Sequence, residues 1–347
     1  MNNIESVLNN DSSYTYIIAE ISQNHDGSLG QAHAFIDAVA STGADAIKFQ
    51  THIADEESTE DEPFRVNFSY EDKTRYEYWK RMEFTEEQWI GLYDHAKEKG
   101  LDFLSSVFSI KALNMLEKVG ISAWKFGSGE VFNTILLEKA LETNKPVILS
   151  TGMSTFDDID RQVELVRKYG NPFVVMQCTT SYPCRAEDIG VNMLEEFEKR
   201  YDCHVGLSDH SAIIYPSLAA TALGAKVIEV HVTMSRHMFG PDVSSSVTVE
   251  ELKQLVEGVR FINLMKNNPY DKKQLTSSLK NLKRIFTKGV YSSNDLRKGD
   301  KLTEDVISIK KPVNGIPASE YKNILNKSIN KDIQKGHAIK WEDLNDE

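Results

Sequence analysis

The stretch Val205-Gly-Leu-Ser-Asp-His-Ser211 has the pattern of a buried parallel strand that ends in reactive side chains. Three apolar or small residues in a row suit a strand covered on both faces, and Ser208, Asp209 and His210 follow where that strand should end. About one helical unit later, the stretch from Val227 to Thr233 repeats the pattern with a second histidine, His231. Two histidines at the ends of neighbouring parallel strands can hold one metal ion, with Ser208 and Asp209 beside it.

Further strand-like runs surround this pair, and stretches with apolar residues near helical spacing separate them. The expected strands are Tyr16–Glu20, Ala46–Gln50, Asp102–Ser106, Ala123–Ser128, Pro146–Thr151, Pro172–Cys178, His204–Asp209 and Val227–Thr233. The expected helices are Leu29–Thr42, Glu86–Lys99, Ile110–Val119, Thr134–Thr143, Asp157–Tyr169, Ala186–Arg200, Ala212–Leu223 and Val249–Met265. Eight alternations over about 250 residues favour a (β/α)8 TIM barrel over a doubly wound sheet, which usually has fewer strands.

The chain divides into a barrel, a linker and a small terminal module. Residues 1–268 hold the eight alternations, and residues 269–283 have the composition of a linker. Residues 284–347 change to short strand-like pieces with an internal repeat, in which Gly299 recurs as Gly336, 37 positions later (336 − 299). A twice-used Asp-aliphatic-x-Lys-Gly turn predicts a small pseudo-symmetric β module. Because so small a module is marginal alone, we expect it to dock on a barrel, its own or a partner's.

Two segments of the barrel have no regular pattern. Residues 1–13 are polar and rich in asparagine, and they form either a loose tail or a short plug under the barrel. The connection from Thr51 to Glu83 is long, acidic and aromatic. A loop of this length is usually a lid or a binding loop, although a solvated surface excursion accounts for its composition equally well.

The composition is that of an ordinary soluble globular chain, with 40% hydrophobic and 27% charged residues among 347. No apolar run approaches the roughly 20 residues of a membrane helix, and the amino terminus lacks a signal-peptide pattern, so we expect a cytoplasmic protein without a membrane partner. The formal net charge of −12 disfavours nucleic acid as a partner. Cys178, Cys184 and Cys203 lack CxxC spacing, so a disulfide framework is not expected.

Nearly every expected strand ends in polar residues, at the edge where TIM-barrel active sites lie. The candidates at this edge are Glu20, Lys48, Gln50, Ser106, Lys125, Ser128, Glu130, Ser150, Thr180, Tyr182, Ser208, His210 and His231. Two lysines with several hydroxyl groups suit a ligand that carries a phosphate and a carboxylate. A partly desolvated lysine can instead form a Schiff base, so a lysine-dependent aldolase is an alternative. Asp242 follows the last strand closely and can lie over the same site.

His210 and His231 supply only two metal ligands, whereas catalytic zinc usually takes three. Mn²⁺ or Mg²⁺, completed by water and substrate oxygen, suits this pair better. The alternative for each ring is a hydrogen-bonded histidine of the core. Glu20 and Glu130 are candidates for holding metal-bound water or sugar hydroxyls.

Several segments together carry a resemblance to a known family. They are Ala19–Ser28, Ile47–Thr51, Trp124–Glu130, Leu149–Met153, Cys178-Thr179 with Tyr182-Pro183, Gly206–Ser211 and Gly240–Asp242. With these segments the chain resembles the sialic acid synthase family, which includes N-acetylneuraminate, legionaminate and pseudaminate synthases. The residues from Arg284 onward resemble the antifreeze-protein-like (SAF) domain that such enzymes carry.

The resemblance implies a metal-dependent transferase that condenses phosphoenolpyruvate with an N-acylated mannosamine-type or diacetamido hexose, giving a nine-carbon 2-keto acid and, by C–O cleavage, phosphate. It implies a divalent metal, Mn²⁺ first and Mg²⁺ or Co²⁺ as alternatives, held by His210 and His231. It also implies that Glu130 orders metal-bound water. The residues expected to hold phosphoenolpyruvate are Lys48, Ser106, Lys125, Ser128, Ser150, Thr180 and Ser208. Those expected to position the sugar are Glu20, Gln50, Tyr182 and Asp242.

The resemblance further implies a homodimer in which the small domain covers the partner's barrel mouth and offers the sugar an arginine. Here Lys311 stands at that position, which keeps the charge and loses the bidentate geometry. Thr180, Val230 and Phe239 also depart from the family pattern, and all of these departures bear on the sugar side. The exact sugar is therefore open, and a catalytically silent saccharide-binding relative is a second alternative beside the aldolase.

Overall fold

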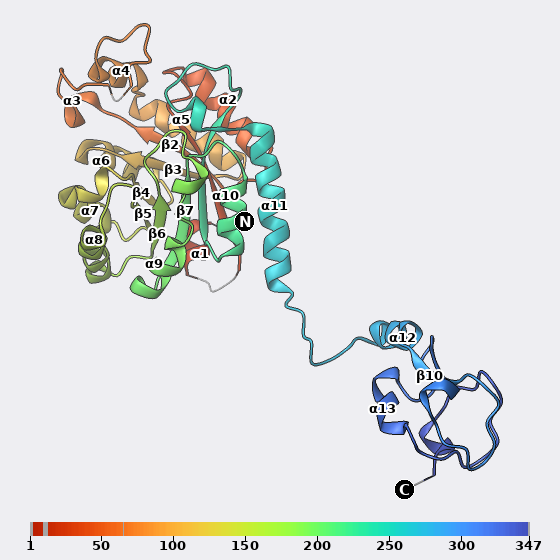
Figure 1. Ribbon diagram of the computed structural model, residues 1–347. Coiled ribbons are helices and arrows are strands. Elements are labelled where there is room, and N and C mark those ends of the chain that lie inside the picture. Colours follow the sequence, from red (N-terminus) through yellow and green to blue (C-terminus); the bar gives the residue numbers. More distant parts are fainter. Residues whose placement is uncertain (1–2, 10–12, 65, 346–347) are drawn as a thin grey trace. The chain divides into compact units, whose positions relative to one another are not determined.

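The computed structural model describes residues 3–9, 13–64 and 66–345, and the chain divides into two compact units at Pro269 and Tyr270. The first unit contains a closed parallel barrel whose strands follow one another in sequence order, and β1 pairs with both β2 and β8 (Figure 1). The strands are β1 (Tyr16–Ser22), β2 (Ala46–Thr51), β3 (Asp102–Val107), β4 (Trp124–Phe126), β5 (Val147–Ser150), β6 (Phe173–Cys178), β7 (His204–Asp209) and β8 (Val227–Thr233). The predicted TIM barrel is confirmed. A short strand, β9 (Val247–Thr248), pairs in parallel with the end of β8.

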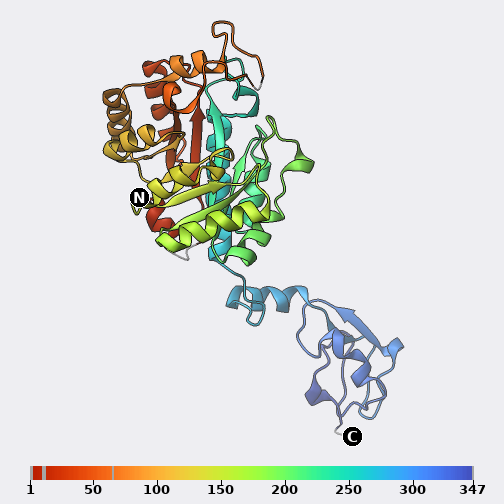
Figure 2. The same ribbon diagram turned by 90° about the vertical axis from the view of Figure 1, so that its left-hand side faces the viewer.

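Helices cover the outside of the barrel between successive strands (Figures 1 and 2). They are α2 (Leu29–Ala40), α5 (Glu86–Glu98), α6 (Ile110–Val119), α7 (Thr134–Leu141), α8 (Phe156–Tyr169), α9 (Met193–Tyr201), α10 (Tyr215–Ala222) and α11 (Val249–Asn267). The early starts expected for α9 and α10 are wrong. Gly190, with φ 70°, separates a 3-10 turn from α9, and Ala212, with φ 62°, cannot belong to a right-handed helix. No helix within the described part of the chain combines the length and apolar character needed to cross a membrane.

The amino-terminal segment closes one end of the barrel. Its helix α1 (Ile4–Leu8) buries Ile4, Val7 and Leu8 against inward-facing strand residues such as Tyr16 and Ile18. The backbone N–H of Ile4 donates to the carboxylate of Asp102, at the start of β3, at 3.0 Å. Of the two expectations for this segment, the plug is therefore the correct one for its described residues. Ligands are therefore expected at the other end, where the strands have their carboxyl termini.

The β2–α5 connection (residues 52–83) is a folded cover over that open end and not a solvated excursion. It contains α3 (Ala54–Glu57) and α4 (Arg75–Met82), drawn above the barrel in Figure 1. Thr74 begins α4 with a capping box. The connection has a small core of its own, made by Ala54, Tyr78, Trp79 and Met82 with Phe64, Phe68 and Tyr76.

The second unit is a small β-rich module with internal pseudo-symmetry. It contains α12 (Ser277–Phe286), the antiparallel pair β10 (Gly289–Ser292) and β11 (Ile307–Lys310), and α13 (Tyr321–Ile324). The carboxylate of Asp332 accepts from the N–H of Lys298 at 2.8 Å, and 37 residues earlier Asp295 accepts from the N–H of Lys335 at 2.7 Å. This reciprocal exchange agrees with the pseudo-symmetric module that the repeated turn predicts. The segment expected as a linker includes the start of α12.

Candidate active site

The carboxyl ends of the strands surround a polar cavity of about 760 Å³, the floor lobe. A second cavity of about 530 Å³, the outer lobe, adjoins it and shares part of its lining. The predicted residues that line the floor lobe are Glu20, Lys48, Gln50, Ser106, Lys125, Ser128, Glu130, Ser150, Thr180, Tyr182, Ser208, His210 and His231. Asp242 lines the outer lobe. Lys311 lies in the second unit, where its ammonium lies 5.2 Å from the ring centroid of Phe286.

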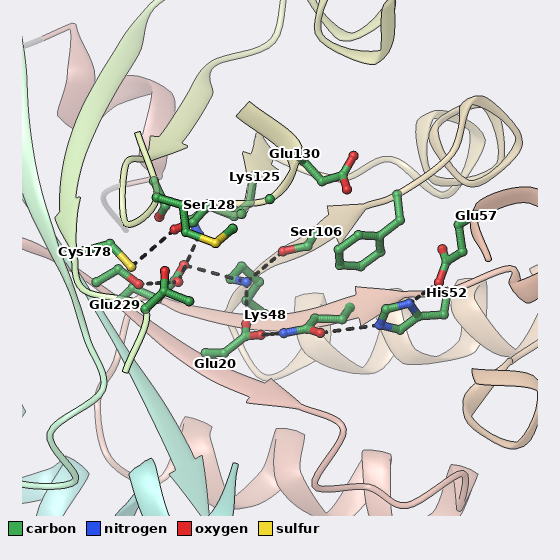
Figure 3. A pocket seen from close by; sticks show the side chains of 18 of the residues that line it. Glu20, Lys48, His52, Glu57, Ser106, Lys125, Ser128, Glu130, Cys178 and Glu229 are labelled. Carbon is green, nitrogen blue, oxygen red and sulfur yellow. Dashed lines mark hydrogen bonds and ion pairs between the residues drawn. The ribbon is translucent and has the colours of Figure 1, made fainter. Parts of the chain in front are cut away.

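Two lysines and two carboxylates form a buried charge cluster at the bottom of the floor lobe (Figure 3). Lys48 Nζ lies 2.6 Å from Glu20 Oε2, and Lys125 Nζ lies 3.1 Å from Glu229 Oε1. Glu229 Oε2 also lies 3.7 Å from Lys48 Nζ, and Ser208 Oγ donates to Glu229 Oε1 at 3.0 Å. All four charged side chains are at most 4% exposed. Each ammonium is therefore compensated and held in place by a carboxylate.

Glu229 is one of two residues of the candidate site that the sequence analysis missed. It is a charged residue inside the apolar run of β8, two positions before His231. Because side chains alternate along a strand, Glu229 and His231 point to the same side, the barrel interior. This two-residue spacing was enough to predict that Glu229 faces the site. A carboxylate that faces a barrel interior needs a buried cation, and Lys48 and Lys125 were already predicted there.

The two buried carboxylates differ in proton affinity. Burial raises the pKa of Glu20 to about 7, although the nearby Lys48 ammonium opposes the shift. Burial would also raise the pKa of Glu229, but the ammonium groups of Lys125 and Lys48 outweigh it and lower that pKa to about 2. Burial would lower the pKa of Lys48, and the two carboxylates reverse that effect and raise it. Glu20 is therefore the member of the cluster that takes up a proton near neutral pH.

Replacing Glu20 with glutamine should change how the stability of the protein depends on pH. A carboxyl group whose pKa is raised on folding stabilises the native state at low pH, and that contribution is lost as the pH rises from the unfolded pKa to the folded one. For Glu20 this window runs from 4.5 to about 7. Relative to Glu20→Gln, the wild-type free energy of unfolding should fall by roughly 3 kcal/mol across it. Urea unfolding at pH 4.5, 6 and 7.5 measures this, and parallel pH profiles would contradict it.

The two histidines come together at the rim above the charge cluster. Their ring centroids are 5.1 Å apart. His210 Nδ1 lies 3.0 Å from the carbonyl oxygen of Thr179, which can only accept, so the proton is on Nδ1 and the lone pair on Nε2, 3.2 Å from the Tyr182 hydroxyl. His231 Nδ1 is buried without a hydrogen-bond partner among the described residues, and burial lowers the pKa of this ring. His210 thus directs Nε2 toward the Tyr182 hydroxyl, and His231 leaves Nδ1 without a partner among the described residues. Imidazole nitrogens in these arrangements can ligate a metal ion.

His210 and His231 suit a metal ion that needs few protein ligands. Within the described residues, no cluster of three or more His, Cys, Asp or Glu side chains is arranged to hold a metal ion. The carbonyl of Thr179 orients His210 in the way that an outer partner orients a ligating imidazole. Two imidazoles leave the remaining positions of an octahedral ion to water and substrate oxygen.

Asp209 does not lie beside the histidines as expected. Its carboxylate accepts from the backbone N–H of Ser211 at 2.9 Å and from the hydroxyl of Ser217 at 3.0 Å, and it lines neither lobe. The alternation along β7 explains this, because Ser208 faces the interior and its neighbour faces the helical layer. Asp209 thus anchors the turn between β7 and α10.

The serines and Glu130 surround the charge cluster. Lys48 Nζ donates to Ser106 Oγ at 3.0 Å, and Ser128 Oγ accepts from the backbone N–H of Gly152 at 3.0 Å. Ser150 Oγ is buried and has no hydrogen-bond partner among the described residues. Burial raises the pKa of Glu130, whose carboxylate accepts from the Asn133 amide at 3.0 Å. A polar ligand in the floor lobe can therefore still form hydrogen bonds with these serine hydroxyls and with the Glu130 carboxylate.

A chain of contacts joins the charge cluster to the β2–α5 connection. Gln50 Nε2 donates to Glu20 Oε1 at 2.8 Å, and Gln50 Oε1 lies 3.4 Å from His52 Nε2. His52 is paired with Glu57 through its other nitrogen, as Figure 3 shows. The His52 ring is stacked between Trp79 and Phe108, with centroids 3.7 and 4.3 Å away. The sequence analysis missed His52, because its aromatic neighbours come from distant segments.

The fold and the position of the cavity define the class of protein. The chain is a TIM-barrel protein with a charged pocket at the carboxyl ends of its strands, followed by a small β module. The NeuB family model matches residues 35–270, and the SAF domain model matches residues 287–345. The chain therefore belongs to the NeuB family, that of the sialic (nonulosonic) acid synthases, and carries a SAF domain.

Two relatives and one solved structure are similar to this chain over most of its length. The N,N′-diacetyllegionaminic acid synthase of Campylobacter jejuni is 32% identical over 332 residues, which cover 94% of this chain and 99% of that protein. The N-acetylneuraminate-9-phosphate synthase of Homo sapiens is 31% identical over 330 residues, 93% of this chain and 91% of that protein. The crystal structure of the N-acetylneuraminic acid synthetase from Leptospira borgpetersenii, in complex with citrate, has a TM-score of 0.68 at 30% identity, over 78% of this chain and 90% of that chain. These relatives are synthases of different sugar acids.

Proposed function

We propose that the protein is a nonulosonic acid synthase that condenses phosphoenolpyruvate with an N-acylated amino-sugar aldose. The observation that carries the proposal is the charge cluster of Lys48 and Lys125 with Glu20 and Glu229, below two imidazole rings whose centroids are 5.1 Å apart. Membership in a family of synthases supports it. The reaction joins an anionic three-carbon substrate to an aldehyde, so it needs cations and a group that polarises the aldehyde in one cavity.

Phosphoenolpyruvate would occupy the floor lobe. Lys48 and Lys125 would contact its phosphate and carboxylate, and the serine hydroxyls would donate to the remaining oxygens. Both ammonium groups are already fixed by Glu20 and Glu229, so binding needs little side-chain ordering. The further residues assigned to this substrate are Ser106, Ser128, Ser150, Thr180 and Ser208.

The aldose would lie above, with its aldehyde at the histidines. His210 and His231 would hold a divalent ion, Mn²⁺ by first preference, which when bound supplies a Lewis acid for the aldehyde oxygen. Tyr182, whose ring lies 4.2 Å from that of His210, and Asp242, which accepts from Ser22 at 2.5 Å, would orient the sugar together with Gln50. Glu130 would order water at the metal site.

The bond changes balance with one water. C3 of phosphoenolpyruvate forms a bond to the aldehyde carbon, and the aldehyde oxygen takes a proton. Water adds to C2 and loses one of its protons. The bond between C2 and the phosphate oxygen then breaks while the remaining C2 hydroxyl proton passes to the departing phosphate, which leaves the 2-keto acid and hydrogen phosphate. We assign the first proton to Glu20, because its pKa of about 7 suits a group that is protonated in part of the molecules at neutral pH.

The geometry disfavours a Schiff-base aldolase. Such an enzyme needs a lysine whose pKa is lowered, so that the neutral amine can attack a carbonyl. Here the carboxylates of Glu20 and Glu229 raise the pKa of Lys48, and Lys125 lies 3.1 Å from Glu229. Borohydride in the presence of a keto acid should therefore trap no adduct on either lysine.

The proposal is tested by phosphate release from phosphoenolpyruvate with manganese. The assay covers N-acetylmannosamine, its 6-phosphate and a diacetamido hexose. Release that needs both substrates supports the proposal, and mass spectrometry of the product identifies the nine-carbon acid. If no sugar of the panel supports phosphate release, the proposal is overturned in favour of a catalytically silent saccharide-binding relative.

Lys125→Ala should weaken phosphoenolpyruvate binding by about 10- to 100-fold, the range for a lost charged hydrogen bond. Titration calorimetry of purified protein measures this directly. Lys118→Ala is the matched control, because Lys118 is an exposed lysine paired with Glu86 at 3.1 Å, outside both lobes. Unchanged affinity of Lys125→Ala would remove Lys125 from the proposed site.

We also propose that the protein is a homodimer in which the SAF domain covers the partner's barrel mouth and offers Lys311 to the sugar. The assignment rests on the SAF domain match and on the exposed position of Lys311. Light scattering of the purified protein tests the dimer. A monomer would contradict it.

A further inference from the structure

His52 lies where the β2–α5 connection leaves the barrel, and its side chain lines the floor lobe. The residue is 5% exposed. Trp79 of α4 and Phe108, which follows β3, are nearly parallel to the His52 ring, with interplanar angles of 10° and 7°. A ring stacked between two others has little freedom to leave its plane. The directions of its two nitrogens are therefore nearly fixed.

Both nitrogens of this ring face hydrogen-bond acceptors. Nδ1 is paired with the Glu57 carboxylate, and Nε2 lies 3.4 Å from Gln50 Oε1 (Figure 3). Gln50 turns this oxygen toward His52 because its Nε2 donates to Glu20 Oε1 at 2.8 Å. A carboxylate and an amide oxygen both accept, so the ring carries a proton on each nitrogen. Glu57, whose side chain is 6% exposed, compensates the resulting positive charge.

The orientation of the Gln50 amide depends on the groups on its two sides. In the reversed orientation, the Gln50 oxygen would face the Glu20 carboxylate, and its NH2 group would face the N–H of His52. Gln23 Nε2, 3.5 Å from Gln50 Oε1, adds a donor on the same side as His52. Because Gln50 lines both lobes and an amide nitrogen has two hydrogens, the second hydrogen can serve a ligand.

The contact between His52 and Gln50 is long, so its effect depends on how firmly the ring is held. It spans 3.4 Å, against about 2.7–3.2 Å for most N–H···O bonds. Active-site hydrogen bonds of this kind often tighten when the substrate binds. A donor that is already fixed by stacking and by Glu57 loses little conformational entropy when that happens.

We propose that His52 is a positioning residue of the reaction: its Nε2–H fixes the Gln50 amide that orients the sugar, while Glu57 and two aromatic rings hold His52 in place. The inference rests on the proposed function of the same cavity. Since His52 acts through Gln50, its removal should affect the sugar only while Gln50 is present.

The experiment is a double-mutant cycle on His52 and Gln50. His52→Phe keeps a flat ring between Trp79 and Phe108 and removes the Nε2–H donor. It should raise KM for the sugar by about 3- to 10-fold, the range for one hydrogen bond, and change kcat and KM for phosphoenolpyruvate by less than about 2-fold. In a Gln50→Ala background, the same replacement should change KM for the sugar by less than about 2-fold. Phosphate release with manganese measures both, with the panel sugar that the wild-type protein uses best.

Glu57→Gln is a second variant, which preserves the shape of the pair if His52→Phe does not fold. It removes the carboxylate that holds the second proton on the His52 ring. KM for the sugar should again rise, and again only in the presence of Gln50.

His95→Phe is the matched control, because His95 is likewise paired with a carboxylate, that of Asp37 at 3.2 Å, and lines neither lobe. It should leave both KM values unchanged. Three results would overturn this inference and leave the proposed function intact: equal effects of His52→Phe in both backgrounds, no effect in either, or an equal rise in KM for phosphoenolpyruvate. If no panel sugar supports phosphate release by the wild-type protein, the proposed function fails and this inference fails with it.

Discussion

Replacing His210 and His231 together with alanine should reduce phosphate release that depends on both substrates by at least about 10³-fold, the upper range for losing a group that stabilises developing charge. The prediction follows from the imidazoles of His210 and His231, which lie 5.1 Å apart between ring centroids and would hold a divalent ion. Electron paramagnetic resonance of free Mn²⁺ gives a readout independent of turnover. The wild-type protein should remove Mn²⁺ from solution, and the double variant should leave it free.

His237→Ala is the matched control for this double variant. His237 is an exposed histidine in the connection that follows β8, only six positions after His231. It should change neither Mn²⁺ binding nor turnover. Full activity of the His210→Ala/His231→Ala variant in the presence of a chelator would refute the metal role, and unchanged Mn²⁺ binding by the variant would place the ion elsewhere.

The barrel was predictable because its pattern is local and repeated. Strands buried on both faces give continuous apolar runs, and their polar ends mark the edge where ligands bind. β7 and β8 were predicted with the ends that the structure shows. The starts of α9 and α10 were not, because Gly190 and Ala212 adopt positive φ values that depend on contacts across the turn, such as that between Asp209 and Ser211.

The β2–α5 connection shows where sequence reasoning stops. Its length and composition suited a lid and a surface excursion equally. What decides between them is packing between residues far apart in sequence, such as His52 between Trp79 and Phe108 and Phe68 against Phe239. No repeating pattern of apolar residues predicts these contacts, because the segment forms only short helices.

The residues that line the candidate site could be predicted from the sequence, but the ion pairs between them could not. Strand-end polar residues gather at one edge of a parallel barrel for topological reasons alone. Which lysine meets which carboxylate depends on the stagger of the strands, which places Glu20 beside Lys48 and Lys125 opposite Glu229. The sequence therefore predicted two cations at this edge, and the structure pairs each of them with a carboxylate.

Replacing Glu229 with leucine should lower the free energy of unfolding by about 3–5 kcal/mol, the range for removing one partner of a buried ion pair. The change leaves Lys125 buried without its carboxylate 3.1 Å away and takes the acceptor from Ser208. It should also abolish turnover, because Lys125 would no longer be held. Urea unfolding at neutral pH measures the stability, where Glu229 is ionised because its pKa is about 2.

The double variant Lys125→Met/Glu229→Leu separates charge compensation from simple packing. It removes both charges and keeps apolar volume, while Lys48 and Glu20 remain paired at 2.6 Å, so it should be more stable than Glu229→Leu alone. The control pair, Lys118→Met and Glu86→Leu, breaks an ion pair of the same 3.1 Å length at the surface and should cost less than about 1 kcal/mol. If Glu229→Leu costs no more than Glu86→Leu, Glu229 does not hold the cluster together. In that case Ser106 and Glu20 would hold the lysines in place. The proposal that Glu229 preorganises the phosphoenolpyruvate site would then be wrong.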